Sequence, residues 1–402
     1  MKKTFIFTLI LLFVINAFAS FYVRPMFNTI EENGQDYLTY SITGVFENPD
    51  FGIGLGLNAY QTEIGGSLFY GKPGMEESTD VLNGLTINLL KLRVGPLFFR
   101  YGISLPKTSG LGILMYNYTN NYKNAFDLGL ITSTAHVEVH APYSIDSIIP
   151  FSYSQSAYLY YGIVRTELGF INIETLIGKT MPKNNSEALR DDVLGSVSAY
   201  VGKNALKIGG EIGYINSLFE SPESTSVTGY GAGVGGILNL GVITFKALPV
   251  VYQMPYYKIG FVDADYEKNL DDPENYNEIL SYNTTRLGGI GTLEINLGNL
   301  LSASARLNYD LTTDFEVQNP ELNGSLYAKI PSEKLPLIIT GKYYKPMENL
   351  EDLTELLDTN TFAEISVGYP ITNGLFMLYT KYYDNINDEF KDKIELSVVA
   401  DF

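Results

Sequence analysis

The last eleven residues, 392–402, alternate strictly enough to predict the kind of element they form. Mostly polar residues fill the positions between the apolar residues Ile394, Leu396, Val398, Ala400 and Phe402. A period of two gives a β-strand with one apolar and one polar face. A length of about ten residues is what a tilted strand needs to cross the hydrocarbon core of a bilayer. The sequence therefore predicts a membrane-spanning strand that ends on phenylalanine.

Residues 1–19 have the composition of a secretory signal peptide. Lys2 and Lys3 precede an apolar run from Phe5 to Phe18, and Ala17-Phe18-Ala19 supplies the small-x-small pattern of a cleavage site. The alternative is an N-terminal membrane anchor, but the run is short for a spanning helix. We expect export, cleavage after residue 19 and one mature domain over residues 20–402.

Alternating segments recur throughout the mature sequence. Leu206, Ile208 and Ile212, for example, alternate with Lys207, Gly209 and Glu211. After Phe18 no stretch approaches the ~20 apolar residues of a membrane-spanning helix. The chain nevertheless contains 31 tyrosines and 22 phenylalanines. An apolar-out, polar-in dyad repeated this often predicts an all-β fold, a transmembrane antiparallel up-and-down β-barrel.

Very short connections alternate with long polar ones. The short turns centre on Gly169, Gly241, Gly298 and Gly374, where we expect positive φ, which glycine adopts without strain. Residues 216–226 and 263–282 are examples of the long ones. Short periplasmic turns and long extracellular loops are typical of outer-membrane barrels. Counted back from Phe402, every long loop falls outside the cell.

With these features and its terminal Phe402, the chain resembles the bacterial outer-membrane β-barrel (porin-like) family. The resemblance implies an integral protein of the outer membrane, surrounded by its lipid. It also implies insertion by the barrel assembly machinery, with Phe402 as the assembly signal. Many porins are trimers, so a homotrimer is expected by analogy alone.

The number of strands follows from the length. A strand with its share of the connections uses about 18 to 19 residues, which predicts roughly 20 strands within a range of 18–22. Residues 21–30 would then form an odd extra strand. Either residues 20–35 contain the first strand or that segment folds inward, and the irregular stretch 111–155 is a second candidate for folding inward.

Composition excludes several classes of function. The net charge of −18 leaves no basic patch for nucleic acid. The chain has no cysteine, so disulfides and thiolate metal sites are ruled out. The run 231–236 matches the dinucleotide-binding pattern G-x-G-x-x-G, but no helix follows it. Alternate glycines over 229–235, like those over 52–56, indicate instead a bare patch of strand where another segment can pack closely.

His136, Glu138 and His140 are the only constellation with metal or catalytic potential, and they include the chain's two histidines. Neighbours at i and i+2 on a strand lie ~6.8 Å apart, too far for all three to hold one ion without a bend. A polar strand face is therefore the preferred interpretation, with zinc or nickel binding as the alternative. No catalytic residue and no organic cofactor are expected, and we predict that the protein is not an enzyme.

Polar positions on the alternating strands are the candidates for a pore lining: Lys207, Glu211, Ser302, Ser304, Arg306, Asn308 and Lys329. Acidic residues are concentrated in the long loop that begins at residue 263, and they predict an acidic outer rim: Asp263, Asp265, Glu267, Asp271, Asp272 and Glu274. Carboxylates at a pore mouth attract cations, and they can also hold Ca²⁺ or Mg²⁺.

Three functions remain open at this stage. A barrel of about 20 strands is wide enough for a water-filled lumen, which favours a porin-like channel for passive diffusion of small hydrophilic solutes or ions, with a mild cation preference. A substrate-specific or plugged transporter is the second. A structural or adhesive outer-membrane barrel with little conductance is the third.

Overall fold

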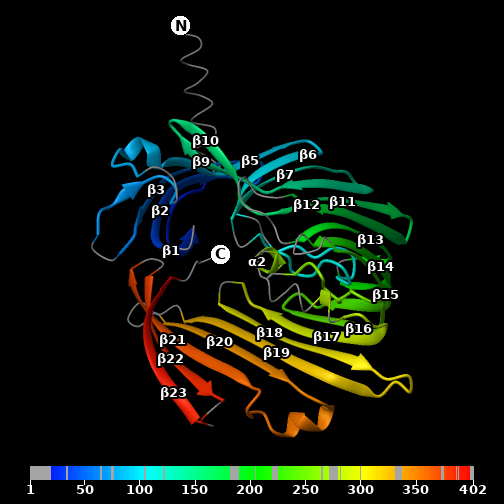
Figure 1. Cartoon of the computed structure of the whole chain (residues 1–402). Helices are drawn as coiled ribbons and strands as arrows, with labels where there is room; N and C mark the ends of the chain where they lie inside the picture. Colours follow the sequence, from blue (N-terminus) through cyan, green and yellow to red (C-terminus); the bar gives the residue numbers. More distant parts are fainter. Residues whose placement is uncertain are drawn as a thin grey trace. The chain divides into compact units, whose positions relative to one another are not determined.

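The fold is seen in a computed structural model (Figure 1). It describes residues 20–398 except 33–34, 64–65, 74–76, 104–105, 121–122, 182–189, 204, 220–224, 264–265, 271–278, 281, 299, 331–336, 373–374, 386 and 388. The predicted signal peptide and Phe402 lie outside the described residues, as do Asp265, Asp271, Asp272 and Glu274 of the predicted rim.

Contacts along the chain divide it into two compact units. Unit 1 comprises residues 1–105, 120–162 and 181–187, and unit 2 comprises residues 106–119, 163–180 and 188–402. Strand β11, Leu159–Leu168, contributes residues to both. The prediction of a single domain over residues 20–402 stays a prediction.

Unit 1 is an antiparallel meander in which each long strand pairs with the next one, as β1 does with β2. Residues 21–30 lie within β1, so they belong to a strand of the sheet and do not fold away from it. The elements are β1 Ser20–Glu32, β2 Gln35–Glu47, β3 Phe51–Gln61, β4 Phe69–Tyr70, the 3-10 helix η1 Val81–Gly84, β5 Leu85–Val94, β6 Leu97–Ile103, β7 Asn124–Ile131, β8 Ala135–Ala141, β9 Tyr143–Ile148 and β10 Phe151–Gln155.

A separate hairpin, β9 with β10, packs on the meander of unit 1. The hydroxyl of Thr86 on β5 donates to the carbonyl of Ile145 at 2.6 Å, and the amide of Ile145 donates to the hydroxyl of Tyr101 at 2.7 Å. These bonds tie the hairpin to β5 and β6. Within the stretch 111–155, residues 143–155 are therefore accounted for by a hairpin of unit 1.

Unit 2 is a longer meander with the same antiparallel neighbour-to-neighbour pairing from β12 to β23. Its elements are β12 Ile171–Thr180, β13 Arg190–Lys203, β14 Leu206–Phe219, β15 Thr225–Asn239, β16 Ile243–Gln253, α2 Tyr266–Asn269, β17 Arg286–Asn296, β18 Leu301–Leu311, β19 Val317–Ile330, β20 Leu337–Pro346, the 3-10 helix η2 Leu350–Thr354, β21 Phe362–Thr372, β22 Leu375–Asp384 and β23 Glu389–Val398.

The described chain thus has 23 strands, of which β4 has two residues and β9 and β10 pair only with each other. The predicted all-β up-and-down fold and the count of about 20 spanning strands are confirmed. No helix among the described residues is long and apolar enough to cross a membrane.

The short turns have the predicted backbone. Gly169, Gly241 and Gly298 have φ values of +68°, +86° and +62°. In two of these turns an asparagine side chain fixes the glycine, because Asn239 Oδ1 and Asn296 Oδ1 each accept the glycine amide at 2.8 Å. The fourth predicted turn, at Gly374, lies outside the described residues.

Some predicted loops are shorter in the structure. Residues 216–219 continue β14 and residues 225–226 begin β15, so the loop predicted over 216–226 is reduced to its middle. Cross-strand pairs such as Asn216 with Thr228 extend the ladder into this polar stretch. The connection between β16 and β17 is longer than predicted, since it runs from residue 254 to residue 285.

Candidate functional site

The strands of unit 2 expose the face that a water-soluble sheet would bury. Val197 on β13 and Ile212 on β14 are 52 % and 60 % exposed, whereas Ser198 and Glu211 on the opposite face are 1 % and 2 % exposed. A water-soluble antiparallel sheet packs its apolar face on a core and solvates the polar one. An extended exposed apolar face is typical of strands in contact with lipid. The predicted apolar-out, polar-in alternation is confirmed for these strands.

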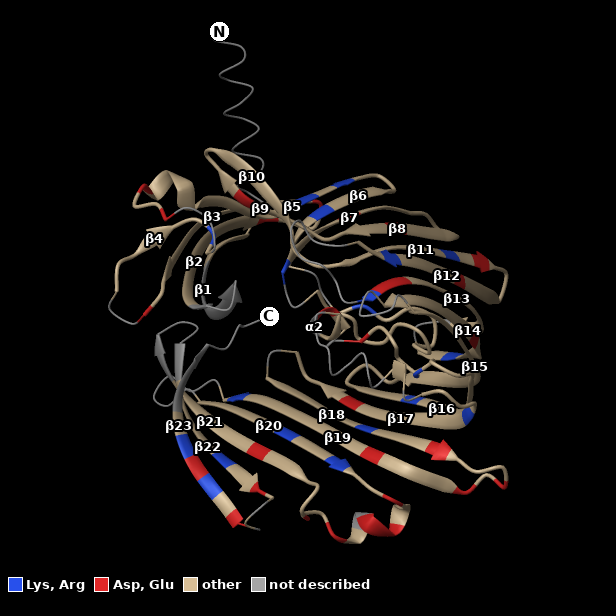
Figure 2. Ribbon diagram, viewed as in Figure 1, with Lys and Arg blue, Asp and Glu red and all other residues tan. Residues whose placement is uncertain are grey.

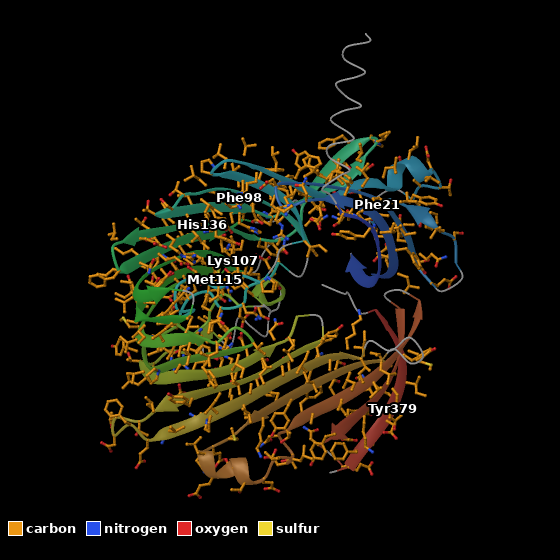
Figure 3. All side chains as sticks on the ribbon, turned by 180° about the vertical axis from the view of Figure 1, so that it is seen from behind. Phe21, Phe98, Lys107, Met115, His136 and Tyr379 are labelled. Carbon is orange, nitrogen blue, oxygen red and sulfur yellow. The ribbon has the colours of Figure 1, made fainter. Side chains whose placement is uncertain are left out.

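A covering segment, residues 106–119, lies on the polar face of this sheet; Figure 3 labels Lys107 and Met115 within it. Lys107 and Tyr118 form an antiparallel bridge that closes the segment into a loop. Gly110 and Gly112 turn its tip with φ values of +58° and +77°. Leu111, Ile113, Leu114 and Met115 are fully buried, so the tip is packed rather than hydrated.

Glu211 of β14 holds the tip of the covering segment. Its Oε2 accepts the amide of Leu111 at 2.7 Å, and its Oε1 accepts the amide of Leu114 at 3.0 Å. A Cβ on Gly110 would lie 2.6 Å from Glu211 Oε2, so glycine lets the backbone approach the carboxylate. Hydrogen bonds to a charged group contribute about 1.5–3 kcal/mol each, which makes Glu211 a strong attachment point.

Glu174 of β12 is the second attachment point, and it is 1 % exposed. Its Oε1 accepts the hydroxyl of Ser109 and the amide of Gly110, both at 2.9 Å. Arg165 of β11 lies 2.6 Å from the other oxygen. A buried carboxylate is costly unless it is paired and hydrogen-bonded, and here both conditions are met.

A support loop, residues 254–263, packs against the covering segment. The amide of Gly260 donates to the carbonyl of Ile113 at 2.7 Å, and the amide of Tyr116 donates to the carbonyl of Val262 at 2.9 Å. Met115 and Val262 form a parallel bridge. The two segments thus share backbone hydrogen bonds, which satisfies polar groups that a buried loop would otherwise leave unpaired.

The glycine face predicted on β15 is where the support loop makes its closest approach. The ring of Tyr257 lies so near to Gly231 of β15 and Gly213 of β14 that a Cβ at either position would overlap it. The Tyr257 hydroxyl also donates to the carbonyl of Ile113 at 3.1 Å. The prediction that alternate glycines make room for another segment is confirmed here. Gly54 and Gly56 of β3 are instead crowded by Leu89 and Asn88 of the neighbouring strand.

Tyr116 links the covering segment to three charged side chains. Lys246 Nζ lies 3.8 Å from its ring centroid and Arg306 Cζ lies 5.1 Å from it, while the hydroxyl donates to Glu294 Oε1 at 2.7 Å. Burial and the bond to Glu294 raise the pKa of Tyr116 to about 12. The phenol is therefore neutral at physiological pH, and its ring faces the basic groups of Lys246 and Arg306.

A second polar cluster lies around the short helix α2. The Tyr266 hydroxyl donates to Asp192 Oδ2 at 2.6 Å, and Arg190 Nε donates to the same oxygen at 3.0 Å. The Tyr118 hydroxyl donates to Glu267 Oε1 at 2.7 Å, which ties α2 to the covering segment. Burial, chiefly, raises the pKa of Tyr266 well above its usual value.

Glu267 was predicted to stand on a solvated acidic rim, and that prediction is wrong. The side chain is buried, 2 % exposed, and hydrogen-bonded to Tyr118 because the loop that carries it folds back onto unit 2. Asp263 is half-buried and contributes to the electrostatic environment of Arg306. A loop's acidic composition did not reveal which carboxylates would be solvated.

Two of the candidate pore-lining residues, Glu211 and Arg306, contact the covering segment. Lys207 is half-buried, with Nζ 5.0 Å from the ring of Tyr200. Four others lie on β18 or β19: Ser302, Ser304, Asn308 and Lys329. Figure 2 colours the ribbon of these strands at their lysine, arginine, aspartate and glutamate positions. A role in lining a pore stays a prediction for all seven.

The residues that reasoning from the sequence did not single out are those that meet the covering segment: Glu174, Lys246, Glu294, Tyr116 and Tyr257. Glu174, Lys246 and Glu294 are charged residues inside alternating strand segments, so the period of two could have identified them. Nothing local in the sequence distinguishes Tyr116 or Tyr257 from the chain's other tyrosines.

The two histidines lie on β8 in unit 1, on one strand face as predicted. His140 is fully buried, with Nδ1 2.7 Å from Asp127 Oδ1 and its ring stacked 4.5 Å from that of Tyr161. His136 Nε2 lies 3.3 Å from Glu138 Oε2 (Figure 3 labels His136 beside Phe98). Among the described residues no three acidic or histidine side chains are grouped to hold a metal ion.

The protein is an antiparallel meander of long strands whose apolar faces are exposed and whose charged faces are buried. These features together define an integral β-sheet protein of the bacterial outer-membrane type.

The chain is similar to OccAB4 of Acinetobacter baumannii, with 11 % identity, 94 % of this chain and 96 % of that chain covered, and a TM-score of 0.35. It is similar to the outer-membrane protein OprD of Pseudomonas aeruginosa, with 11 % identity, 82 % and 88 % covered and a TM-score of 0.36. It is also similar to a BenF-like porin of Pseudomonas fluorescens Pf-5, with 12 % identity, 94 % of this chain and 95 % of that chain covered, and a TM-score of 0.33.

No protein-family model and no curated protein matches the chain. Identities of this size do not transfer a substrate or an activity, and the functional argument rests on the contacts of the chain's own residues.

Proposed function

We propose that the protein is a porin-like channel of the outer membrane for passive diffusion of small hydrophilic solutes or ions, narrowed by the covering segment. The observation that carries the proposal is the polar face of unit 2, where charged side chains hold a loop by hydrogen bonds. A purely structural barrel has no need of buried carboxylates that bind loop amides, because apolar packing would stabilise it at lower desolvation cost.

A substrate-specific transporter is the second candidate, and the covering segment also favours it. Glu211, Glu174 and Tyr116 fix that segment at three points, as the constriction of a specific channel would require. A specific channel shows saturable flux for one solute class, whereas a general porin shows flux that rises linearly with concentration. Liposome-swelling rates for sugars, amino acids and organic acids of matched size distinguish the two.

Single-channel recording in a planar bilayer tests the proposal directly. We expect discrete conductance steps from the mature protein. Replacing residues 109–115 with a glycine-serine linker of equal length should increase the step size, because the tip held by Glu211 and Glu174 is then absent. A folded, heat-modifiable barrel that shows no conductance, with or without the tip, would exclude both channel hypotheses and favour the structural one.

We further propose a mild cation preference. Exposed carboxylates remain on the loop that carries η2, at Glu348, Glu351 and Glu355, and the chain's net charge is −18. Carboxylates near a pore mouth attract cations within a Debye length of about 8 Å at physiological salt. Reversal potentials under a KCl gradient test this, and an anion-selective channel would show that basic residues such as Arg306 dominate. Ca²⁺ or Mg²⁺ binding at the acidic loops stays part of the same proposal.

The resemblance to outer-membrane β-barrels also suggests how the protein assembles in the membrane. We propose that Phe402 is read by the barrel assembly machinery and that the mature protein forms a homotrimer in the membrane. Deleting Phe402 should leave secretion intact and reduce the folded protein recovered in the outer membrane. Sedimentation of the detergent-purified protein tests the trimer, and a monomeric mass would reject it. The absence of enzymatic activity stays a prediction.

A further inference from the structure

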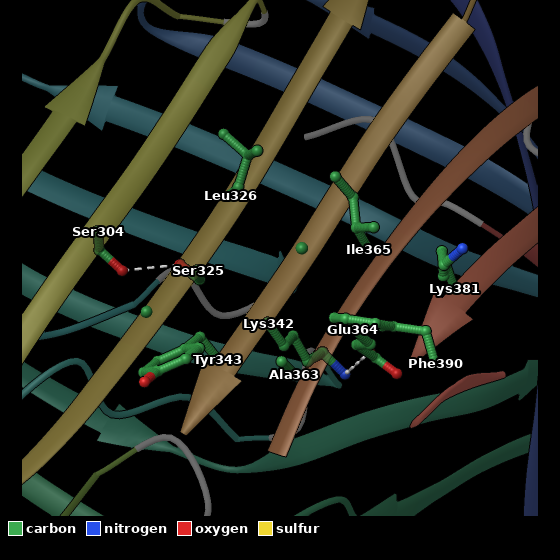
Figure 4. A pocket seen from close by; sticks show the side chains of 12 residues that line it. Ser304, Ser325, Leu326, Lys342, Tyr343, Ala363, Glu364, Ile365, Lys381 and Phe390 are labelled. Atoms are coloured by element: carbon green, nitrogen blue, oxygen red, sulfur yellow. Dashed lines mark hydrogen bonds and ion pairs between the residues drawn. The ribbon is translucent and has the colours of Figure 1, made fainter. Parts of the chain in front are cut away.

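A hollow of about 350 Å³ lies on the sheet of unit 2 over strands β18 to β23 (Figure 4). Gly324, Gly341 and Ala363 lie along it and leave room because they are small, while Tyr343, Ile365 and Lys381 also line it. Ile365 is 48 % exposed, and the cross-strand pairs Leu326 with Gly341 and Gly341 with Ile365 place these residues on one face. The hollow therefore opens on the apolar face, which contacts lipid.

The glycines of this hollow are not required by the packing of the chain itself. A Cβ on Gly324 would come no closer than 3.5 Å to Tyr343, and a Cβ on Gly341 no closer than 3.5 Å to Leu326. Gly213 and Gly231, in contrast, leave no room for a Cβ because Tyr257 occupies the space. The space above Gly324 and Gly341 is available to a molecule from outside the chain.

Lys381 gives the hollow a charge. It is an exposed side chain on β22, paired across the sheet with Asp392 of β23, and its Nζ lies 5.7 Å from the ring centroid of Phe390. No carboxylate of the described residues forms an ion pair with Lys381. Lys342 and Glu364 also line the hollow, and they pair with each other at 3.5 Å.

The depth of Lys381 in the membrane also places its charge near lipid headgroups. Lys381 lies three residues before the end of β22 at Asp384, about 10 Å along the strand. In the predicted orientation that end is extracellular, so Lys381 lies in the outer half of the bilayer. A lysine at this depth extends its ammonium group towards the interface, where lipid phosphates are found.

We propose that this hollow binds an anionic lipid of the outer leaflet, with one acyl chain over Gly324 and Gly341 and the headgroup phosphate on Lys381. The apolar hollow recognises the chain by burial and the ammonium group recognises the phosphate by charge. The proposal depends on the membrane location of the sheet and not on channel activity, so loss of conductance and loss of lipid binding are separate results.

Native mass spectrometry of the full mature protein, released from detergent, tests it. The protein is titrated with phosphatidylglycerol and with phosphatidylcholine of identical acyl chains. Wild type should retain the phosphatidylglycerol about fivefold more strongly, the factor that roughly 1 kcal/mol per basic residue at a membrane surface gives. K381Q should abolish the preference. K179Q, which changes an exposed lysine of β12 away from the hollow, should keep it.

G341L fills the hollow and should reduce retention of both lipids. Its matched control is G291L, because Gly291 of β17 has no atom within 4 Å of an added Cβ and lies away from the hollow. A heat-modifiability gel confirms that each variant folds, and A363L serves if G341L does not. Equal retention of the two lipids by wild type, or retention by G341L equal to that of G291L, overturns the proposal.

Discussion

The two halves of the sheet in unit 2 use glycine for opposite purposes. In β14 and β15, Gly213 and Gly231 lie against Tyr257, and the polar face there is covered by residues 106–119 and 254–263. In β19 and β20, a Cβ added to Gly324 or Gly341 would make only ordinary contacts, at 3.5 Å or more. Both sets occur in strands of similar alternation. A glycine in a spanning strand therefore lets a second segment approach its backbone closely only where other contacts hold that segment in place.

In the covered half of the sheet, buried carboxylates hold the covering segment in place. Glu174 and Glu211 each accept two hydrogen bonds from the covering segment, whereas Glu364 in the other half pairs with an exposed lysine. Hydrogen bonds from backbone amides fix the position of a loop more strictly than an exposed ion pair does, since the latter contributes only about 0–1 kcal/mol. Four predictions test this contrast, in order of decreasing effect.

The largest effect is expected from G231L. The new side chain must displace Tyr257, and with it the support loop. Because ring atoms of Tyr257 lie within 2.6 Å of an added Cβ, overpacking should destabilise the protein by about 3 kcal/mol or more, the upper end of the usual range. The matched variant G324L places the same side chain on the open half and should stay within about 0.5 kcal/mol of wild type. Urea or guanidinium unfolding in lipid vesicles measures both. Equal losses for the two variants would mean that Tyr257 does not restrain β15.

E211Q should loosen the covering segment without unfolding the sheet. The neutral amide keeps one acceptor oxygen, and the loss of a charge-assisted hydrogen bond costs about 1.5–3 kcal/mol. Hydrogen exchange at the amides of Leu111 and Leu114 should speed up, while exchange at β19 and β20 stays unchanged. E364Q is the control from the uncovered half. Protection of Leu111 that is as high in E211Q as in wild type would count against the role of this carboxylate.

A smaller effect is expected where the η2 loop docks on β20. Lys345 is fully buried and binds Asp358 at 2.8 Å and the carbonyl of Glu355. The hydrogen bond from Lys345 lowers the pKa of Asp358. Because the folded pKa is depressed, the stabilisation is present above the usual carboxyl pKa of about 4 and is lost as the pH falls through the folded value.

D358N should therefore cost about 1–2 kcal/mol at pH 7, less than a fully buried pair because Asp358 is 26 % exposed. Cleavage by a glutamate-specific protease at Glu351 or Glu355 should be faster in the variant at pH 7. The wild-type loop should open only below about pH 4, when Asp358 becomes protonated. A cleavage rate unchanged by D358N would show that the capping box of Asn349 and Asp352 holds the loop alone.

The smallest effect is spectroscopic. The pKa of Tyr116 is raised to about 12, first by burial and then by the bond to Glu294. A raised folded pKa means that the stabilisation is complete below about pH 10 and is lost as the pH rises through 12. Absorbance at the tyrosinate band should show one late-titrating phenol fewer in Y116F than in wild type.

The repeating part of the structure could be read from the sequence. A period of two in segments such as 206–214 sets which side chains share a face, because successive strand residues point to opposite sides. The turns at Gly169, Gly241 and Gly298 could be placed because positive φ selects glycine. The inverted burial of Ile212 and Glu211 follows from the same alternation once lipid is the solvent.

The packing of the irregular segments depends on tertiary contacts and could not be predicted from the sequence. Residues 106–119 have no period, and their partners Glu174, Glu211 and Glu294 lie far away in sequence, so no local pattern links them. Glu267 has the same composition around it as a solvated loop residue, yet it is buried by Tyr118. The period of two shows on which face of its own strand a side chain lies. Which residues that side chain contacts depends on a second segment, and the conformation of the loops decides where that segment lies.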